Sequence, residues 1–287
     1  ISLVFNEFKL PKGAKLFVYN TETNYFKGAF TSRNNPPSGV FHVSPVKGSK
    51  ITIEYFAPEK RTFDANLIIS KVGHDFIGIL NESGKVSSGF GDSGYCNIDI
   101  NCSQGEGWQK VKHSVVMLLT GGYQCTGSLI NNIRSNGQPY LLTAHHCISN
   151  PDEAVETVVV FNYESPKCNG KEGPDDQTMS GTNLISTSPD DDQLDFSLLK
   201  MMDSIPVEYN PFFVGWSLDT SNISQTVTIH HPNGDVKKIS KDLDPPVTRT
   251  YPGTLYNVES HWKLLEWDMS ATEKGSSGAS LFNQNKR

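Results

Sequence analysis

A serine between glycines near the end of the sequence could act as a nucleophile. In the run Gly275-Ser276-Ser277-Gly278 the glycines permit a tight turn, so that backbone N–H groups can converge beside a serine hydroxyl. Such N–H groups stabilise the oxyanion that develops when a carbonyl is attacked. Taken alone the run is weak evidence, because Gly-Ser-Ser-Gly is also typical of loops and linkers.

Two other stretches supply the groups that a serine nucleophile needs. His145 and His146 lie in Thr-Ala-His-His-Cys, and Asp195 opens the run Asp-Phe-Ser-Leu-Leu. A histidine can remove the serine proton, and a buried aspartate can fix the histidine tautomer. The apolar residues after Asp195 predict a buried strand, where an unpaired carboxylate would be costly. The residues alone do not decide between His145 and His146.

Short strands joined by turns are expected to position these groups in an all-β chain. Residues 1–80 are rich in β-branched and aromatic residues with regularly spaced turn signals, which predicts a β-sandwich-like domain. Its candidate strands are 16–19, 25–30, 39–43, 50–56 and 66–69. Residues 95–287 form a second all-β domain, with candidate strands at 114–119, 157–161, 195–199, 226–230 and 262–265. Helical patterns are scarce, and residues 154–158 are too short to count.

Residues 81–94 are polar and rich in Gly and Ser, which predicts an interdomain linker. Lys85 is the only Lys or Arg between Lys71 and Lys110. It is either a solvated linker charge or a processing site for a protease that cuts after basic residues.

Composition excludes several classes of partner. The formal net charge is -6 and there is no basic run, so nucleic-acid binding is not expected. The longest apolar run near the centre, Val115–Leu119, is too short to span a bilayer, so no membrane anchor is expected. The sequence begins at Ile1, which a removed targeting peptide or a trimmed chain would explain.

The five cysteines lie between positions 96 and 168. No CxxC pair or Cys/His spacing for a metal is present, so neither a metal site nor a cofactor is expected. Disulfides are the better interpretation, and they predict a secreted protein or one in another oxidising compartment, such as a cell surface or a periplasm. Asp190, Asp191 and Asp192 compete with Asp195 as candidate carboxylates, but their Pro-led polar loop indicates solvated charge or a weak calcium site.

Five segments resemble the bacterial lysyl endopeptidases, which are chymotrypsin-like (trypsin-like) serine proteases. They are 91–102, 125–130, 141–147, 230–240 and 273–280. The resemblance runs from about Gly91 to the end, and residues 1–80 resemble the pro-region of such precursors more loosely. It implies a serine protease precursor: a pro-domain (1–80), a linker (81–94) and a chymotrypsin-like double β-barrel (95–287) that is incomplete at its C-terminus.

The resemblance implies a role for each candidate residue. His146 is the general base because it directly precedes the cysteine, and Asp195 holds its tautomer. Ser277 is the nucleophile, with Ser276 as the alternative, and the N–H groups of Gly275 and Ser277 form the oxyanion hole. No cofactor or metal is implied.

Ser276 departs from the pattern of many chymotrypsin relatives. They carry an aspartate there, and a freed N-terminal ammonium pairs with it to order the oxyanion loop. A serine offers no such charge, so this switch is expected to be absent. The resemblance also places His230 and Tyr251 near the substrate cleft.

Two disulfides and a missing remainder are also expected. Cys125 should pair with Cys147, because its strand must lie beside the loop carrying His146; the family implies Cys102 with Cys168. Cys96 is left over, with its partner expected beyond Arg287.

The segment that reads a lysine side chain in this family follows the nucleophile loop. The C-terminal remainder of the protease domain, beyond Arg287, is therefore an expected partner. The sequence indicates a secreted serine endopeptidase acting on proteins or peptides after Lys, or Arg, through an acyl-enzyme. The alternative is a non-catalytic surface or binding protein built on a protease scaffold.

Overall fold

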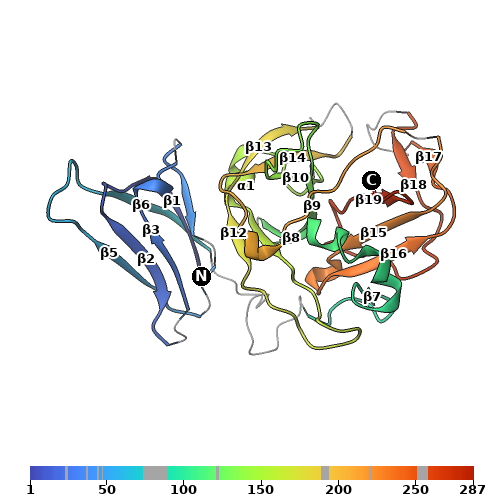
Figure 1. Ribbon diagram of the computed structural model, residues 1–287, viewed down its shortest axis with the longest axis horizontal. Helices are drawn as coiled ribbons and strands as arrows, with labels where there is room; N and C mark the ends of the chain where they lie inside the picture. Colours follow the sequence, from blue (N-terminus) through green and yellow to red (C-terminus); the bar gives the residue numbers. More distant parts are fainter. Residues whose placement is uncertain are drawn as a thin grey trace. The chain divides into compact units, whose positions relative to one another are not determined.

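The computed structural model describes residues 1–22, 25–36, 38–43, 45–46, 48–73, 90–120, 123–188, 194–219, 221–250 and 258–287. The chain divides into two compact units, Ile1–Ser87 and Ser88–Arg287 (Figure 1). Most of the expected linker, including Lys85, lies outside the described residues.

The first unit contains two three-stranded antiparallel sheets around one core. Buried and exposed residues alternate along the strands, with Phe5, Leu16 and Val18 facing inward, as expected when one face of each sheet is covered. One sheet has the order β4 (Phe41–Val43), β1 (Ser2–Lys9), β6 (Asn66–Gly73), and the other β3 (Tyr25–Phe30), β2 (Lys15–Asn20), β5 (Thr52–Phe56). The central strand β1 is absent from the strands expected from sequence.

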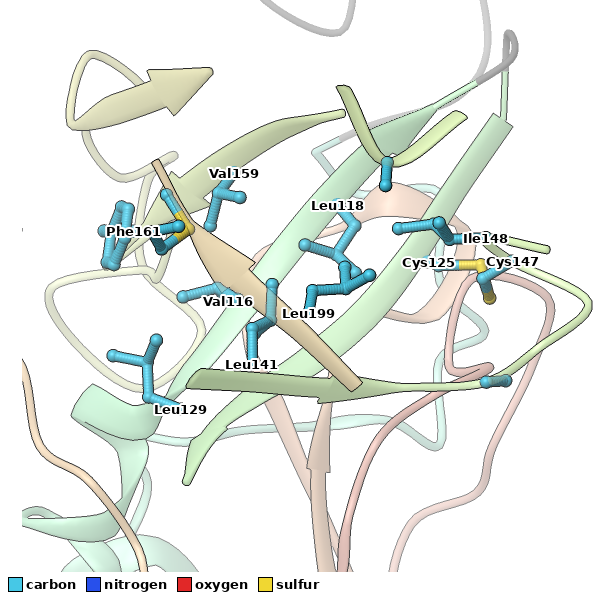
Figure 2. Close-up of a cluster of buried hydrophobic side chains, with 13 residues drawn as sticks. Val116, Leu118, Cys125, Leu129, Leu141, Cys147, Ile148, Val159, Phe161 and Leu199 are labelled. Carbon is cyan, nitrogen blue, oxygen red and sulfur yellow. A yellow bond between two sulfur atoms is a disulfide. The ribbon is translucent and has the colours of Figure 1, made fainter. Parts of the chain in front are cut away.

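A seven-stranded antiparallel sheet dominates the second unit. Its core gathers Val116, Leu118, Leu129, Leu141 and Leu199 from strands far apart in sequence (Figure 2). The strand order is β12 (Thr178–Ser180), β11 (Val158–Phe161), β8 (Val115–Thr120), β9 (Tyr123–Ile130), β10 (Tyr140–Thr143), β14 (Ser197–Met201), β13 (Thr182–Thr187).

A four-stranded antiparallel sheet forms the other half of this unit. Val227, Ile229, Ile239 and Phe282 from this sheet pack with Trp108 in a second core. The order is β19 (Leu281–Asn283), β15 (Thr226–His230), β16 (Lys238–Asp242), β7 (Ile98–Asp99), and a two-stranded ladder joins β17 (Val247–Arg249) to β18 (His261–Lys263).

The helices are short, and one was not expected. The α-helix α1 (Pro151–Glu156) begins at Asn150, whose side chain accepts a hydrogen bond from the Glu153 N–H, with proline in the first turn. These start signals outweigh the lack of a long apolar period. The 3-10 helices are Ser32–Asn34, Ser103–Trp108, Val111–Ser114, Val207–Tyr209 and Pro232–Gly234.

Both expected disulfides are present. Cys102–Cys168 joins Cα atoms 4.4 Å apart. Cys125–Cys147 joins Cα atoms 6.3 Å apart and lies in the core of the seven-stranded sheet (Figure 2). Cys96 is exposed and unpaired within the described residues. Among those residues, no helix is long and apolar enough to cross a membrane.

Candidate active site

Strand pairing brings His146 to Asp195. Thr143 at the end of β10 pairs with Ser197 at the start of β14, so the residues just beyond each strand meet. The Nδ1 atom of His146 lies 3.0 and 2.9 Å from the two carboxylate oxygens of Asp195. The backbone N–H of His146 also donates to Asp195 Oδ1, at 3.1 Å. A carboxylate that accepts both bonds fixes the ring and leaves Nε2 as the proton acceptor.

Asp195 is not inside a strand, which corrects the expectation from its apolar neighbours. It precedes β14 and has a φ of 49°, in the left-handed region that non-glycine residues seldom adopt. In this turn before the strand, the carboxylate lies against the ring of His146 and its side chain is 26% exposed. Strain of this kind, held by surrounding structure, is often found at functional sites.

The neighbouring His145 is hydrogen-bonded to the strands beside the histidine loop. Its Nδ1 lies 2.7 Å from Thr187 Oγ1, which lies 2.6 Å from Ser197 Oγ. Ser197 Oγ donates to the Ile148 carbonyl, at 2.6 Å. These bonds join the histidine loop to β13 and β14, so His145 takes part in holding this loop while His146 faces Asp195.

The electrostatics of the pair follow from this geometry. The hydrogen bond from the ring to Asp195, together with the carboxylate charge, raises the pKa of His146 above 6.5 despite partial burial. Burial alone would raise the pKa of Asp195, but the hydrogen bonds from the ring and backbone of His146 and the nearby positive charge lower it. The pair therefore favours an ionised Asp195 beside a His146 ring whose protonated form is stabilised.

The loop carrying Ser277 is tied to strand β9. Thr126 donates from its backbone N–H to the Ser277 carbonyl and from its hydroxyl to the Gly275 carbonyl, both at 2.8 Å. Gly278 has a φ of 82°, and a Cβ there would lie 2.9 Å from Ala144 N and closer still to Thr126 O. Glycine is thus required for the loop to pack against the segment that leads into His146.

The two N–H groups expected to form the oxyanion hole are available. Gly275 has a φ of 87°, and a Cβ on it would lie 2.6 Å from the His231 carbonyl. Within the described part of the chain, no acceptor is paired with the N–H of Gly275 or of Ser277. The Ser277 hydroxyl forms no hydrogen bond with His146 among these residues, an arrangement common before substrate binds.

His230, expected near the substrate cleft, lies against the loop that carries Ser277. Its ring is fully buried, and both nitrogens are hydrogen-bonded, Nδ1 to Ser276 Oγ and Nε2 to Ser240 Oγ. It contacts the nucleophile loop from below and is not available to substrate. Tyr251, like Lys85, lies outside the described residues.

The last residues of the expected linker, Gly91 and Gly94, are hydrogen-bonded to the protease unit, and Gly94 anchors the nucleophile loop, which sequence reasoning missed. The Glu273 carboxylate accepts hydrogen bonds from the Gly94 N–H, at 3.0 and 3.2 Å, and from Asn233 Nδ2, at 2.8 Å. The Asp235 carboxylate accepts from the Gly91 N–H, at 2.9 Å. The acidic residue Glu273, two positions before Gly275, was the available signal.

The one group of acidic side chains that could hold a metal ion, among the described residues, contains none of the candidate site residues. It comprises Asp242, Asp244 and Asp268, of which two are exposed. Such clusters are common without an ion and carry no assignment.

Comparisons with known proteins identify the family of the chain. Residues 90–287 match the family model described as lysyl endopeptidase, C-terminal domain. The lysyl endopeptidase of Pseudomonas aeruginosa is 30% identical over 257 residues, which cover 83% of this chain and 53% of that protein. The chain thus spans about half the length of the curated relative it matches.

Solved structures with a similar course of the chain are also serine proteases or endopeptidases. The active form of the Rv3671c protease from M. tuberculosis has a TM-score of 0.41 at 15% identity, covering 67% of this chain and 74% of its own. A Glu endopeptidase has a TM-score of 0.38 at 17% identity, covering 62% and 78%. These scores are low, so the assignment rests on the sequence matches: the chain belongs to the lysyl endopeptidase family.

Proposed function

We propose that this chain is part of a secreted serine endopeptidase that hydrolyses peptide bonds after Lys or Arg through an acyl-enzyme. The observation that carries the proposal is the His146–Asp195 pair, with ring and backbone hydrogen bonds of 2.9 to 3.1 Å to one carboxylate. Membership of the lysyl endopeptidase family supports it independently.

Acylation is proposed to begin with attack by Ser277 Oγ on the scissile carbonyl carbon. His146 Nε2 takes the serine proton, and Asp195 stabilises the imidazolium that forms. The N–H groups of Gly275 and Ser277 donate to the oxyanion. When the tetrahedral intermediate collapses, the C–N bond breaks and His146 gives its proton to the leaving amine.

Deacylation repeats these steps with water as the nucleophile. His146 removes a proton from the water, which attacks the ester carbonyl, and the proton then returns to Ser277 Oγ as the acid product leaves. Oxyanion donors of this kind are each worth about 100- to 1,000-fold in kcat.

Preference for a basic side chain requires an acidic group in the specificity pocket, because a buried ammonium needs a partner. The resemblance assigns that group to the segment after the nucleophile loop. We therefore propose the C-terminal remainder of the domain, beyond Arg287, as the partner that completes the pocket.

The first unit is proposed to be a pro-domain, released by cleavage after Lys85. Replacing Lys85 with Gln in the full-length precursor should block a new N-terminus at Val86, detected by N-terminal sequencing. Two disulfides support secretion, because such bonds persist in oxidising compartments.

Covalent labelling tests the proposal directly. A fluorophosphonate should label the full-length protein at Ser277, identified by peptide mass spectrometry, and Ser277→Ala should abolish both labelling and hydrolysis of lysyl esters. Ser276→Ala should still be labelled at Ser277, which separates the two serines. A folded protein that is not labelled would instead be the non-catalytic binding protein.

A further inference from the structure

The buried His230 lies directly beneath the nucleophile loop. Its side chain is on β15, with 0% exposure. Nδ1 lies 2.8 Å from the hydroxyl of Ser276, the residue before the proposed nucleophile, and Nε2 lies 2.9 Å from the hydroxyl of Ser240 on β16. A ring held at both nitrogens has no freedom to rotate, so it fixes the distance between Ser276 and the sheet.

The directions of these hydrogen bonds can be assigned from the groups at each end. Ser240 Oγ lies 2.7 Å from the Ala271 carbonyl, which only accepts, so the Ser240 hydroxyl donates there and accepts from His230 Nε2–H. The ring then accepts at Nδ1 from the Ser276 hydroxyl. Ser276 Oγ in turn accepts from the Glu273 N–H, at 3.1 Å.

This buried relay, formed by Ser276, His230 and Ser240, is complete without a net charge. A neutral imidazole has one donor and one acceptor, and the relay uses both. Burial, with the positive charge of Lys238, lowers the pKa of His230 to about 3, in keeping with a neutral ring. Fully satisfied buried networks of this kind hold their members in one arrangement.

The relay connects a side chain of the loop to the sheet, whereas the other contacts hold the loop by its backbone. Thr126 binds the carbonyls of Gly275 and Ser277, and the Asn233 N–H donates to the Lys274 carbonyl at 2.5 Å. These bonds fix backbone oxygens. The Ser276 N–H donates to the Glu273 carbonyl at 3.1 Å, and its carbonyl accepts from the Ala279 N–H at 3.0 Å. The relay adds a link from the Ser276 side chain to the sheet, between the two residues whose N–H groups have no acceptor among the described residues.

We propose that His230 is a positioning residue for the acyl transfer proposed above: by neutral hydrogen bonds through Ser276 and Ser240, it holds the nucleophile loop with the N–H groups of Gly275 and Ser277 aimed at the oxyanion. The inference rests on the proposed function. It assigns to a neutral relay the ordering of the loop that an ion pair would otherwise supply.

The test uses the full-length protease, two substitutions of Ser276 and one of His230, the two ends of one hydrogen bond. Ser276→Ala removes the donor to His230, and Ser276→Thr keeps it. His230→Phe keeps a planar aromatic ring at this position and removes both hydrogen bonds. His231→Phe is the matched control, because His231 is equally buried and adjacent, but its side chain bonds the Asp235 carbonyl and not the loop.

We expect Ser276→Ala and His230→Phe to lower kcat by about 100-fold, because a displacement of about 1 Å has that effect, with KM for a lysyl ester changed less than about twofold. Ser276→Thr should restore most of kcat. The double variant should equal His230→Phe alone, because both changes break the same relay. Affinity for a peptide aldehyde, whose adduct fills the oxyanion hole, should fall with kcat.

Three outcomes would overturn the inference. If both variants kept kcat within about twofold of the parent while melting as early as His231→Phe, the relay would be structural only. If Ser276→Thr were as slow as Ser276→Ala, the hydroxyl would not be the reason. If His230→Phe did not fold, the two Ser276 variants would still decide. A parent that neither hydrolyses esters nor labels at Ser277 would remove the proposed function itself, and this inference with it.

Discussion

The two polar arrangements on either side of the site differ in burial and charge. The His146–Asp195 pair is partly open to solvent, with 55% and 26% of the side chains exposed, and it combines a titrating ring with an ionised carboxylate. The buried relay around His230 is closed to solvent and neutral. In both, an oxygen atom lies within hydrogen-bond distance of the histidine Nδ1. His146 donates from Nδ1 to Asp195, whereas His230 accepts at Nδ1 from Ser276.

The difference matches the task that we propose for each histidine. A general base must gain and lose a proton during each cycle, so its ring needs a partner that stabilises the charged form. A ring that only holds a loop in place works best without changing charge, since an unpaired buried charge is expensive. The tautomer of each ring is set by its neighbour. The Asp195 carboxylate only accepts, so His146 Nδ1 carries a proton. The Ser276 hydroxyl accepts from the Glu273 N–H and donates its own proton to His230 Nδ1.

Strand β9 joins the two arrangements. Cys125 forms the disulfide to Cys147 beside the base, and the next residue, Thr126, binds the nucleophile loop. The Thr126 carbonyl also accepts from Thr143 Oγ1 at 2.9 Å, close to the histidine loop. Because neighbouring residues of one strand hold both loops, a shift of β9 would move both.

The largest expected effect comes from removing the charge of the pair. Asp195→Asn keeps the shape of the side chain but can stabilise the wrong tautomer of His146, so kcat should fall by about 10,000-fold. Steady-state kinetics on a lysyl ester measures this, with the melting temperature as a control for folding. An Asn variant within about tenfold of the parent would show that the pair does not direct the base.

Removing either disulfide should lower stability, by amounts that differ with loop length. Model loop entropy gives about 4 kcal/mol for the loop closed by Cys102–Cys168 and about 3 kcal/mol for that closed by Cys125–Cys147, for separations of 66 and 22 residues. Denaturant unfolding of Ser double variants checks this. The Cys125–Cys147 variant should lose more activity at equal folded fraction, because it frees the base loop; equal activities would contradict the coupling through β9.

A methyl group added at the contact between the Ser277 loop and the His146 loop should show whether close packing or backbone strain matters more for activity. Gly278→Ala would place a Cβ against Thr126 and Ala144, so kcat should fall by about 100-fold. Gly137→Ala is the matched control: its φ of 67° is also positive, but a Cβ there meets nothing within 4 Å. If both variants lost kcat equally, strain and not the contact between the loops would be responsible.

The smallest expected effect concerns pH. Because Asp195 raises the pKa of His146 above 6.5, kcat/KM should rise with pH through a single-proton step above 6.5, and Asp195→Asn should move that step to lower pH. The relay should add no second step above about pH 4, since the pKa of His230 is about 3. A step involving two protons would show that both histidines titrate together.

Stability should change in the opposite sense over the same range. A raised pKa in the folded state means that the stabilisation of protonated His146 is fully present below pH 6.5 and is lost as pH rises through the folded pKa. As pH rises, the contribution of the pair to the melting temperature should therefore decrease while activity increases. Asp195→Asn should flatten this dependence.

Local patterns predicted strands well where a segment is a continuous apolar run, and they also pointed to the runs that contain the candidate residues. The apolar runs at β8, β11 and β15 predicted strands within one or two residues of those observed. The runs around His146, Asp195 and Ser277 were found from residue type and spacing. The short helix α1 and the central strand β1 were missed, because a capped single turn and a strand interrupted by polar residues give little periodic signal.

The sequence by itself determined which groups are available: a histidine before a cysteine, an aspartate before an apolar strand, and a serine in a Gly-X-Ser-Gly turn. Tertiary structure decided how they are used. His230 follows a β-strand pattern that would suit either a cleft or a core, and only the packing of β15 against β16 and the nucleophile loop makes it a buried, neutral support. Its role depends on Ser240 and Ser276, residues brought to it by strand pairing and loop closure, and such long-range partners leave no mark in local sequence.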